Sequence, residues 1–299
     1  GRPVIRGLDG PRIAVLSAGL GTDDVSNVSQ DHAVTIEPFL ADQIEILKGP
    51  STLLFGSGAI GGVVNMVDGR IAEAPVEGFG GRAELHGNTV NNERAGMVRL
   101  DAGNGAAAMH VDYVRRDGDD FDLPDGSLLN SAIDQKSGAA GAGYASDAGF
   151  LGVSFSRYDS LYGIPLGPSN AEPEAGEEAE EIRLDQEQTR VDLRGGIYSP
   201  WTWLDKLSFR FADNDYEHVE LADGEVGTRF TNDAWEGRIE AVHAGFGGWT
   251  GAFGYQASSR DFAAIGAEAF VPPTTTDDWG LFLIERREFE PFELELGAR

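Results

Sequence analysis

Residues 207–211 read Leu207-Ser208-Phe209-Arg210-Phe211, so that apolar and polar side chains alternate one by one. Successive side chains of a β-strand point to opposite faces of its sheet. The alternation therefore predicts a strand with one apolar face and one polar face. The same pattern returns at 151–156, 249–256 and 292–296. These stretches together indicate an antiparallel sheet whose two faces meet different surroundings.

From about residue 80 onward the pattern repeats often enough to predict about eleven strands. Short connections alternate with long ones along the series, and long ones are predicted at 159–185 and 218–232. Outer-membrane barrels have this asymmetry between their two ends. Five tryptophans near predicted strand ends would suit the aromatic girdles of such a barrel. The predicted strands are 80–87, 93–102, 106–116, 135–145, 149–158, 186–198, 206–217, 233–243, 248–259, 275–287 and 292–299.

Charged side chains occupy the polar positions of these strands, and a lipid-facing surface would reject them. We therefore predict that Arg194, Arg210, Glu236 and Arg238 face a lumen, where they contact water or a polar domain inside it. A register error of one residue would turn all four toward lipid.

Composition excludes several classes of function. The 299 residues carry 23 Lys and Arg against 50 Asp and Glu, a formal net charge of −27, which argues against nucleic acid as a partner. Cysteine is absent, which excludes disulfides and thiolate chemistry. No apolar run is long enough for a transmembrane helix. The sequence also lacks the G-x-S-x-G and H-E-x-x-H motifs, and we predict that the protein is not an enzyme and needs no cofactor.

The first 72 residues have a different pattern, in which short β-like runs alternate with glycine-rich turns. The runs at 4–6, 12–16, 44–48 and 62–67 predict strands, and 29–40 predicts a short helix. The glycine-rich part contains no G-x-x-x-x-G-K-[ST] motif, which disfavours a phosphate-binding loop.

The most specific text of the chain is Gln43-Ile-Glu-Ile-Leu-Lys-Gly-Pro-Ser-Thr-Leu-Leu-Phe-Gly-Ser-Gly-Ala-Ile-Gly-Gly-Val-Val-Asn65. It resembles the plug-domain signature of TonB-dependent outer-membrane receptors, and the earlier Val4-Ile-Arg6-Gly7 resembles a strand of the same plug. The matching positions that we expect to be structural are Arg6, Gly7, Glu45, Lys48, Gly49, Pro50, Gly56, Gly58, Gly61 and Gly62.

The resemblance implies a small α+β plug over residues 1–72, followed over residues 80–299 by the first half of an all-β membrane barrel. About eleven of an expected 22 or so strands would be present, so the chain would be part of a longer protein. The implied function is active uptake of a scarce nutrient across the bacterial outer membrane. The implied partners are outer-membrane lipid and the TonB energy-coupling complex, whose contact segment is not in this sequence.

A narrower resemblance concerns the cargo. Ser29-Gln30-Asp31-His32-Ala33 is similar to a plug segment of the zinc-uptake branch, and the stretches 150–165 and 281–297 resemble that branch's barrel. By this likeness Asp31, His32 and Glu285 are candidate ligands of a divalent cation such as zinc, which would be cargo. In the alternative interpretation, Asp31 and His32 cap the predicted helix and Glu285 is one more lumen charge.

Other cargoes and another class stay open at this level. The receptor could instead carry a ferric siderophore, haem or cobalamin. The protein could also be a passive porin or adhesin, although a porin or adhesin has no reason to carry the sequence of residues 43–65. The loop at 167–181 is acidic and contains no histidine, unlike the histidine-rich external loop frequent in zinc receptors. The oxygen-rich stretches 121–126 and 213–215 do not have the spacing of a calcium loop, and we predict surface turns there.

Overall fold

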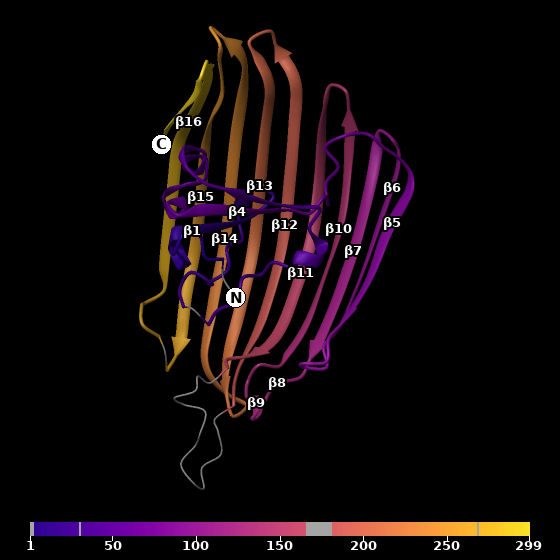
Figure 1. Ribbon diagram of the computed structural model, residues 1–299, viewed down its shortest axis with the longest axis vertical. Coiled ribbons are helices and arrows are strands. Elements are labelled where there is room, and N and C mark those ends of the chain that lie inside the picture. The colour runs from indigo at the N-terminus through magenta and orange to yellow at the C-terminus, as the bar shows by residue number, and fades with distance from the viewer. Residues whose placement is uncertain (1–2, 30, 166–180, 268) are drawn as a thin grey trace.

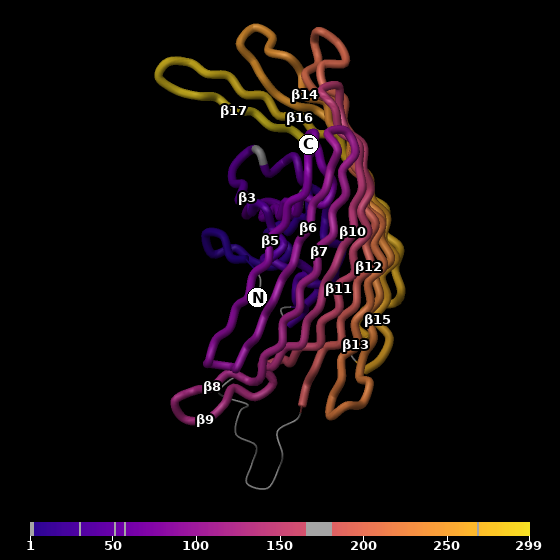
Figure 2. The backbone as a smooth tube through the Cα atoms, turned by 90° about the vertical axis from the view of Figure 1, so that its right-hand side faces the viewer, coloured from indigo at the N-terminus to yellow at the C-terminus, as the bar shows by residue number. Residues whose placement is uncertain are grey.

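The computed structural model describes residues 3–29, 31–165, 181–267 and 269–299. An eleven-stranded sheet forms a curved wall, and a four-stranded sheet lies on its concave side (Figures 1 and 2). We call the eleven-stranded sheet the wall and the residues before it the plug. No helix in the described ranges is long and apolar enough to cross a membrane.

All eleven predicted strands are present in the wall, most of them longer than predicted. Each pairs antiparallel with its neighbours in the order β17-β16-β15-β14-β13-β12-β11-β10-β7-β6-β5. The strands are β5 (Val76–Gly87), β6 (Arg94–Gly105), β7 (Ala107–Gly118), β10 (Ile133–Ser146), β11 (Gly149–Gly163), β12 (Ile182–Trp201), β13 (Leu204–Ala222), β14 (Glu225–Phe246), β15 (Trp249–Gly266), β16 (Thr274–Phe289) and β17 (Phe292–Ala298).

Short turns gather at one end of the wall, the upper end in Figure 1, which we call the short-turn end. The opposite end holds the longer connections, and a small hairpin of β8 (Phe121–Leu123) and β9 (Gly126–Leu128) stands there where the sequence predicted only surface turns. The long connection predicted at 218–232 is wrong, because β13 and β14 stay paired as far as Ala222 and Glu225. Polar residues such as His218 and Asn232 hid these strand ends by making them resemble a loop. The acidic loop predicted at 167–181 lies, up to residue 180, outside the described residues.

The two faces of the wall have opposite polarity. The outward face exposes apolar side chains, among them Val111, Leu151, Val153, Phe155, Val191, Leu193, Phe211, Ile239, Phe253 and Leu281. The face toward the plug buries polar ones, among them Asp112, Ser137, Ser154, Gln188, Arg190, Asp192, Arg194, Asn214, His218, Asn232, Glu236 and Arg238. This inversion suits a sheet with hydrocarbon outside and a polar domain inside.

The plug is built around a small mixed sheet. Its strand order is β2-β1-β4-β3, with β1 (Ile13–Ser17) parallel to β4 (Gly62–Val67) and antiparallel to β2 (Leu20–Gly21), and with β3 (Gln43–Leu47) antiparallel to β4. Its other elements are 3-10 helices: η1 (Gly10–Arg12), η2 (Pro38–Leu40), η3 (Pro50–Phe55) and η4 (Ser57–Ala59).

The helix predicted at 29–40 is wrong, since in its described part only η2 forms. Three consecutive residues, Val34 to Ile36, are β-branched, which disfavours a helix. Pro38 also disfavours a helical conformation of the residue before it. The run at 4–6 makes only a single bridge between Ile5 and Leu8 and no strand, because the chain turns at Arg6 and Gly7 with φ of 51° and 76°.

Residues 43–65 form β3, η3, η4 and β4, and two of their glycines stand where a larger side chain would not fit. A Cβ on Gly61 would lie 2.6 Å from Ile13 Cδ1, and one on Gly62 would lie 2.6 Å from Ile5 Cδ1. Larger residues there would push apart the plug's own layers. Glu45 holds the same sheet by accepting a hydrogen bond of 2.8 Å from Asn65 Nδ2.

Candidate metal site

Two histidines and one carboxylate meet where the plug touches the wall, toward the end opposite the short turns. His32 comes from the extended plug segment before η2, while His218 and Glu220 come from β13. Because His218 and Glu220 are two positions apart on a strand, they point to the same face, which here is the inner one. All three residues are buried, and their ligand atoms lie within 4.8 Å of one another.

The distances among these atoms suit a small cation. Glu220 Oε1 lies 3.2 Å from His32 Nε2 and 3.9 Å from His218 Nε2. Tetrahedral zinc with bonds of about 2.0–2.1 Å places its ligand atoms about 3.3 Å apart. Small side-chain adjustments would therefore bring this trio, His32, His218 and Glu220, onto a metal ion. The trio supplies three ligands, so a fourth position would be left for water or another ligand.

Neighbouring groups fix both imidazole rings. His32 Nδ1 donates a hydrogen bond of 3.1 Å to the carbonyl of Val25, which leaves Nε2 facing Glu220. Nδ1 of His218 lies 2.9 Å from the hydroxyl of Tyr216, which in turn accepts a hydrogen bond from Gln186. Partners of this kind on the far ring nitrogen orient histidine ligands in metal sites.

Apolar rings close the site on one side. Phe230 stacks on the His218 ring at 4.5 Å between centroids and meets the His32 ring edge-on at 5.1 Å. Phe230 belongs to a buried cluster with Val25, Tyr216 and Ala264. The trio therefore lies in a dry environment, where electrostatic interactions with a cation are screened less than in water.

The carboxylate of the trio has only the two imidazoles as described partners. Burial opposes protonation of His32, but its hydrogen bonds to Glu220 and to the carbonyl of Val25 outweigh this and raise the pKa of His32 above its ordinary value. Among the described residues, His218 Nε2 has no hydrogen-bond partner. A buried carboxylate beside an unpaired imidazole nitrogen is an arrangement that a bound cation would complete.

The sequence-predicted ligands are only partly brought together. His32 is in the trio, but the carboxylate of Asp31 instead contacts Ser29 Oγ. Glu285 lies on β16 near the short-turn end, and its carboxylate oxygen Oε1 is 3.0 Å from His243 Nε2. The predicted grouping of Glu285 with His32 is therefore corrected, because β13 and not β16 passes the plug at His32. The helix that follows, η2, begins only at Pro38 and is capped by Glu37, so the alternative role of Asp31 and His32 as helix caps is wrong as well.

Sequence reasoning missed His218 and Glu220. The available signal was His218-Val219-Glu220 in a region where strands alternate, because this spacing places an imidazole and a carboxylate on one face. The polar residues of 218–232 predict a loop, and this prediction hides the signal.

The four lumen charges predicted from the sequence all lie on the face toward the plug. Arg194 donates to Asp68 at 3.1 Å, and Glu236 accepts from the backbone N–H of Gly21 at 2.7 Å. Arg238 donates to the carbonyl of Leu54. Arg210 lies beside Gly19, where a Cβ would be 3.5 Å from the arginine Cδ.

The plug backbone near the trio is held by a row of wall side chains. Gln188 and Asn214 both donate to the carbonyl of Thr22, at 2.8 and 2.9 Å, and Asn232 donates to the carbonyl of Asp23 at 2.7 Å. These contacts are polar, so water could replace them at a lower cost than that of separating an apolar core. They set the position of Val25 and, through it, of His32.

Comparisons with known proteins agree with this architecture. Residues 1–63 match the family model described as TonB-dependent Receptor Plug Domain. The solved structure titled "Copper transporter OprC" is similar with a TM-score of 0.74 and 16% identity over 96% of this chain and 46% of that chain. The FrpB iron transporter from Neisseria meningitidis (F5-1 variant) has a TM-score of 0.77 and 14% identity, with coverage of 98% and 51%. The alcaligin outer-membrane receptor FauA from Bordetella pertussis has a TM-score of 0.68 and 17% identity, with coverage of 98% and 46%. The chain thus spans about half the length of these structures.

Proposed function

We propose that this chain forms the plug and part of the barrel of a TonB-dependent transporter that takes up a divalent metal cation, zinc first of all, across the bacterial outer membrane. The observation that carries the cargo is the buried trio of His32, His218 and Glu220. The class is that of a transport receptor and not of an enzyme. Its partners are outer-membrane lipid, the metal and the periplasmic TonB complex.

The wall supports the proposed location. Its outward face is apolar over the middle of the strands, and its inner face is polar and contacts the plug. Trp201 and Trp203 stack at the short-turn end, at 5.8 Å between ring centroids, where an aromatic girdle belongs. The plug match to residues 1–63 supports energy coupling through TonB, since a passive porin or adhesin has no use for that domain.

The chemistry of the trio favours a bare cation over an anionic chelate. Two imidazole nitrogens and a carboxylate oxygen are ligands for zinc and for other late first-row cations. Copper binds most N/O sites more tightly than zinc does, so the two metals have to be compared directly. In a receptor for a ferric siderophore, haem or cobalamin, the trio would be a structural hydrogen-bond cluster with no metal role.

Calorimetry on the whole protein in detergent micelles tests the proposal, with Zn²⁺, Cu²⁺ and Mn²⁺ titrated separately. We expect saturable Zn²⁺ binding that weakens at least about 100-fold in His32→Ala/His218→Ala, because two of three protein ligands are lost. The matched control is His243→Ala/Glu285→Ala, which removes another histidine–carboxylate contact and should leave zinc binding unchanged. Zinc binding that survives the first double substitution, or that disappears in the control, would contradict the assignment of the trio.

A further inference from the structure

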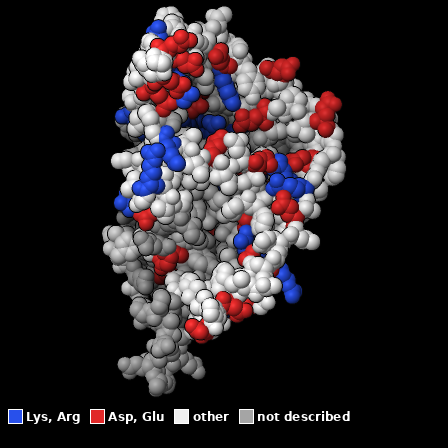
Figure 3. All heavy atoms as spheres, viewed as in Figure 1, with Lys and Arg blue, Asp and Glu red and all other residues white. Residues whose placement is uncertain are grey.

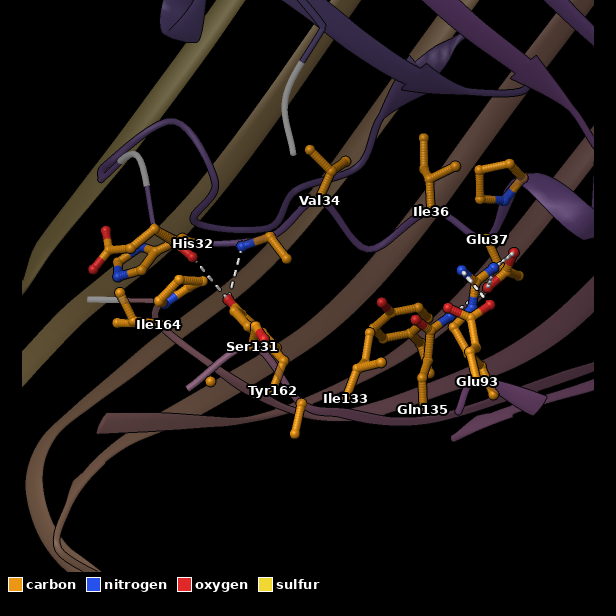
Figure 4. Close-up of a pocket in the computed structure, with 18 of the residues that line it drawn as sticks. His32, Val34, Ile36, Glu37, Glu93, Ser131, Ile133, Gln135, Tyr162 and Ile164 are labelled. Carbon is orange, nitrogen blue, oxygen red and sulfur yellow. Dashed lines mark hydrogen bonds and ion pairs between the residues drawn. The ribbon is translucent and has the colours of Figure 1, made fainter. Parts of the chain in front are cut away.

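The wall holds the plug backbone on both sides of His32. Figure 4 shows the hydroxyl of Tyr162, on β11, beside this segment, where it accepts a hydrogen bond of 2.8 Å from the N–H of Ala33 and donates one of 3.2 Å to the carbonyl of Asp31. The carbonyl of Ala33 accepts a further hydrogen bond, of 3.1 Å, from Nε2 of Gln186 on β12. Because the backbone groups before and after His32 are bound to the wall, the wall sets the position of this histidine.

Gln186 also reaches the second histidine of the trio. In the register of β12 and β13 it lies directly opposite His218, and both side chains are fully buried. Its Nε2 donates a second hydrogen bond, of 2.9 Å, to the hydroxyl of Tyr216, and this hydroxyl lies 2.9 Å from Nδ1 of His218. One amide nitrogen is therefore linked to both imidazoles, to that of His32 through the plug backbone and to that of His218 through Tyr216.

The partners of Gln186 also fix the orientation of its amide group. The carbonyl of Ala33 can only accept a hydrogen bond, so the amide has to turn its nitrogen and not its oxygen toward that carbonyl. Both hydrogens of the nitrogen are then used, and within the described chain Oε1 of Gln186 has no hydrogen-bond partner. Since a buried oxygen without a partner costs free energy, the two donated hydrogen bonds are what this side chain contributes.

The contacts of Gln186 join neutral groups, unlike many contacts nearby. On the face of the molecule seen in Figure 3, basic side chains mostly lie next to acidic ones. The Coulomb attraction of such pairs falls off slowly with distance. Hydrogen bonds between neutral groups instead weaken steeply when their distance or angle is wrong. The contacts of Gln186 are therefore suited to fixing the direction of a ring or of a backbone segment.

We propose that Gln186 is a positioning residue of the metal site, which directs the ligand atoms of His32 and His218 to the same point through one amide nitrogen. It acts on His32 through the carbonyl of Ala33 and on His218 through the hydroxyl of Tyr216, and it does not touch the metal itself. A small tetrahedral cation needs its ligand atoms at closely defined distances, so loss of this nitrogen weakens metal binding. The inference rests on the proposed function, because it takes the trio as the metal site.

Calorimetry with Zn²⁺ on the whole protein in detergent micelles tests the inference in Gln186→Met. Methionine has a similar length and fills the same space, but it donates no hydrogen bond. We expect the Zn²⁺ affinity to fall about 10- to 100-fold. The matched control is Gln135→Met, because Gln135 is another buried wall glutamine that donates to the plug, at 2.6 Å to Glu37, away from His32 in Figure 4. This control should leave the Zn²⁺ affinity unchanged.

Two further measurements separate positioning from a general loosening of the protein. Visible absorption of Co²⁺ depends on its coordination geometry, and at saturating Co²⁺ the spectrum should change in Gln186→Met and stay the same in Gln135→Met. In the Tyr216→Phe background, where the link to His218 is already broken, Gln186→Met should lower the Zn²⁺ affinity by a smaller factor than in the wild type. If the methionine variant does not fold, Gln186→Asn takes its place, because its amide is one methylene too short to reach both acceptors.

The outcomes separate this inference from the proposed function. A wild type that fails to bind Zn²⁺ would overturn the proposed function and this inference with it. Zn²⁺ binding by the wild type that Gln186→Met and Gln186→Asn fully retain would overturn the inference alone. An equal loss in Gln135→Met, or an unchanged Co²⁺ spectrum in Gln186→Met, would make Gln186 a structural residue and also overturn it. The same fold-loss in the Tyr216→Phe background as in the wild type would overturn the link to His218.

Discussion

Two regions join the plug to the wall, and they differ in the way their charges are balanced. At the short-turn end, Asp68 of the plug lies between two arginines, 3.1 Å from Arg194 and 3.7 Å from Arg70. Arg70 also pairs with Asp112 at 3.0 Å, and Asp112 in turn lies 2.8 Å from His110 Nε2. At the other end, the trio of His32, His218 and Glu220 sets one carboxylate against two imidazoles, and no arginine or lysine is among its described hydrogen-bond and ion-pair partners.

This difference suggests different roles for the two regions: the one around Asp68 attaches the plug to the wall, and the trio is the proposed ligand site. A buried charge is tolerated when it is paired and hydrogen-bonded, and the chain around Asp68 meets that condition with the protein's own groups. The trio has only imidazole partners for its carboxylate, and under the proposed function a metal cation would complete it. The plug is thus held by charge pairs near the place where its chain enters the wall, whereas the trio at the opposite end has no such pairs with arginine or lysine among its described partners.

The largest effect should come from breaking the short-turn region. Asp68→Ala leaves Arg194 buried without its carboxylate and weakens the pairing of Arg70, which should destabilise the seating of the plug by about 3–5 kcal/mol. Hydrogen exchange of β4 and the following residues 68–72 measures this loss. Asp159→Ala is the matched control, because Asp159 pairs with an exposed arginine, Arg157, and should cost no more than about 1 kcal/mol. Equal protection in the two variants would contradict the attachment role.

A smaller effect should come from removing the hydroxyl group that orients His218 in the trio. Tyr216→Phe removes the hydroxyl at His218 Nδ1 and keeps the ring that packs against Phe230. Zinc affinity should fall about 10- to 100-fold, as for other losses of an orienting partner, while hydrogen exchange of the plug near Asp68 stays as in the wild type. Tyr255→Phe on the wall serves as the control. Unchanged zinc affinity in Tyr216→Phe would show that the hydroxyl does not orient the ligand.

Much of the fold could be predicted because its signals are local. The alternation of apolar and polar side chains depends only on neighbouring residues, and all eleven wall strands are present in the order expected. The inward position of Arg194, Arg210, Glu236 and Arg238 follows from the same alternation. The prediction was wrong where polar inner faces looked like loops, at 218–232, and where β-branched residues before Pro38 left an extended segment in place of a helix.

The candidate site was less predictable because it depends on which strand passes which plug residue. His32 and Glu220 are 188 positions apart, and no local pattern gives that neighbour relation. The resemblance to the zinc-uptake branch singled out Asp31 and His32, and the structure places only His32 in the trio.

The smallest effect concerns pH. The region around Asp68 should hold the plug less firmly as the pH falls. Burial disfavours the charged form of Asp68, but Arg70 and Arg194 outweigh this and lower the pKa of Asp68 below its ordinary value of 3.8. A carboxyl whose pKa is lowered by folding contributes stability that is fully present above the ordinary value and is lost as the pH falls through the folded-state pKa. Plug seating should therefore hold steady down to about pH 4 and weaken below it. Pepsin cleavage of the plug, followed against pH, measures this slope, and in Asp68→Asn, which cannot titrate, the slope should be flatter. The same slope in the variant as in the wild type would place the acid sensitivity elsewhere and remove the argument that Asp68 is the charged anchor of the plug.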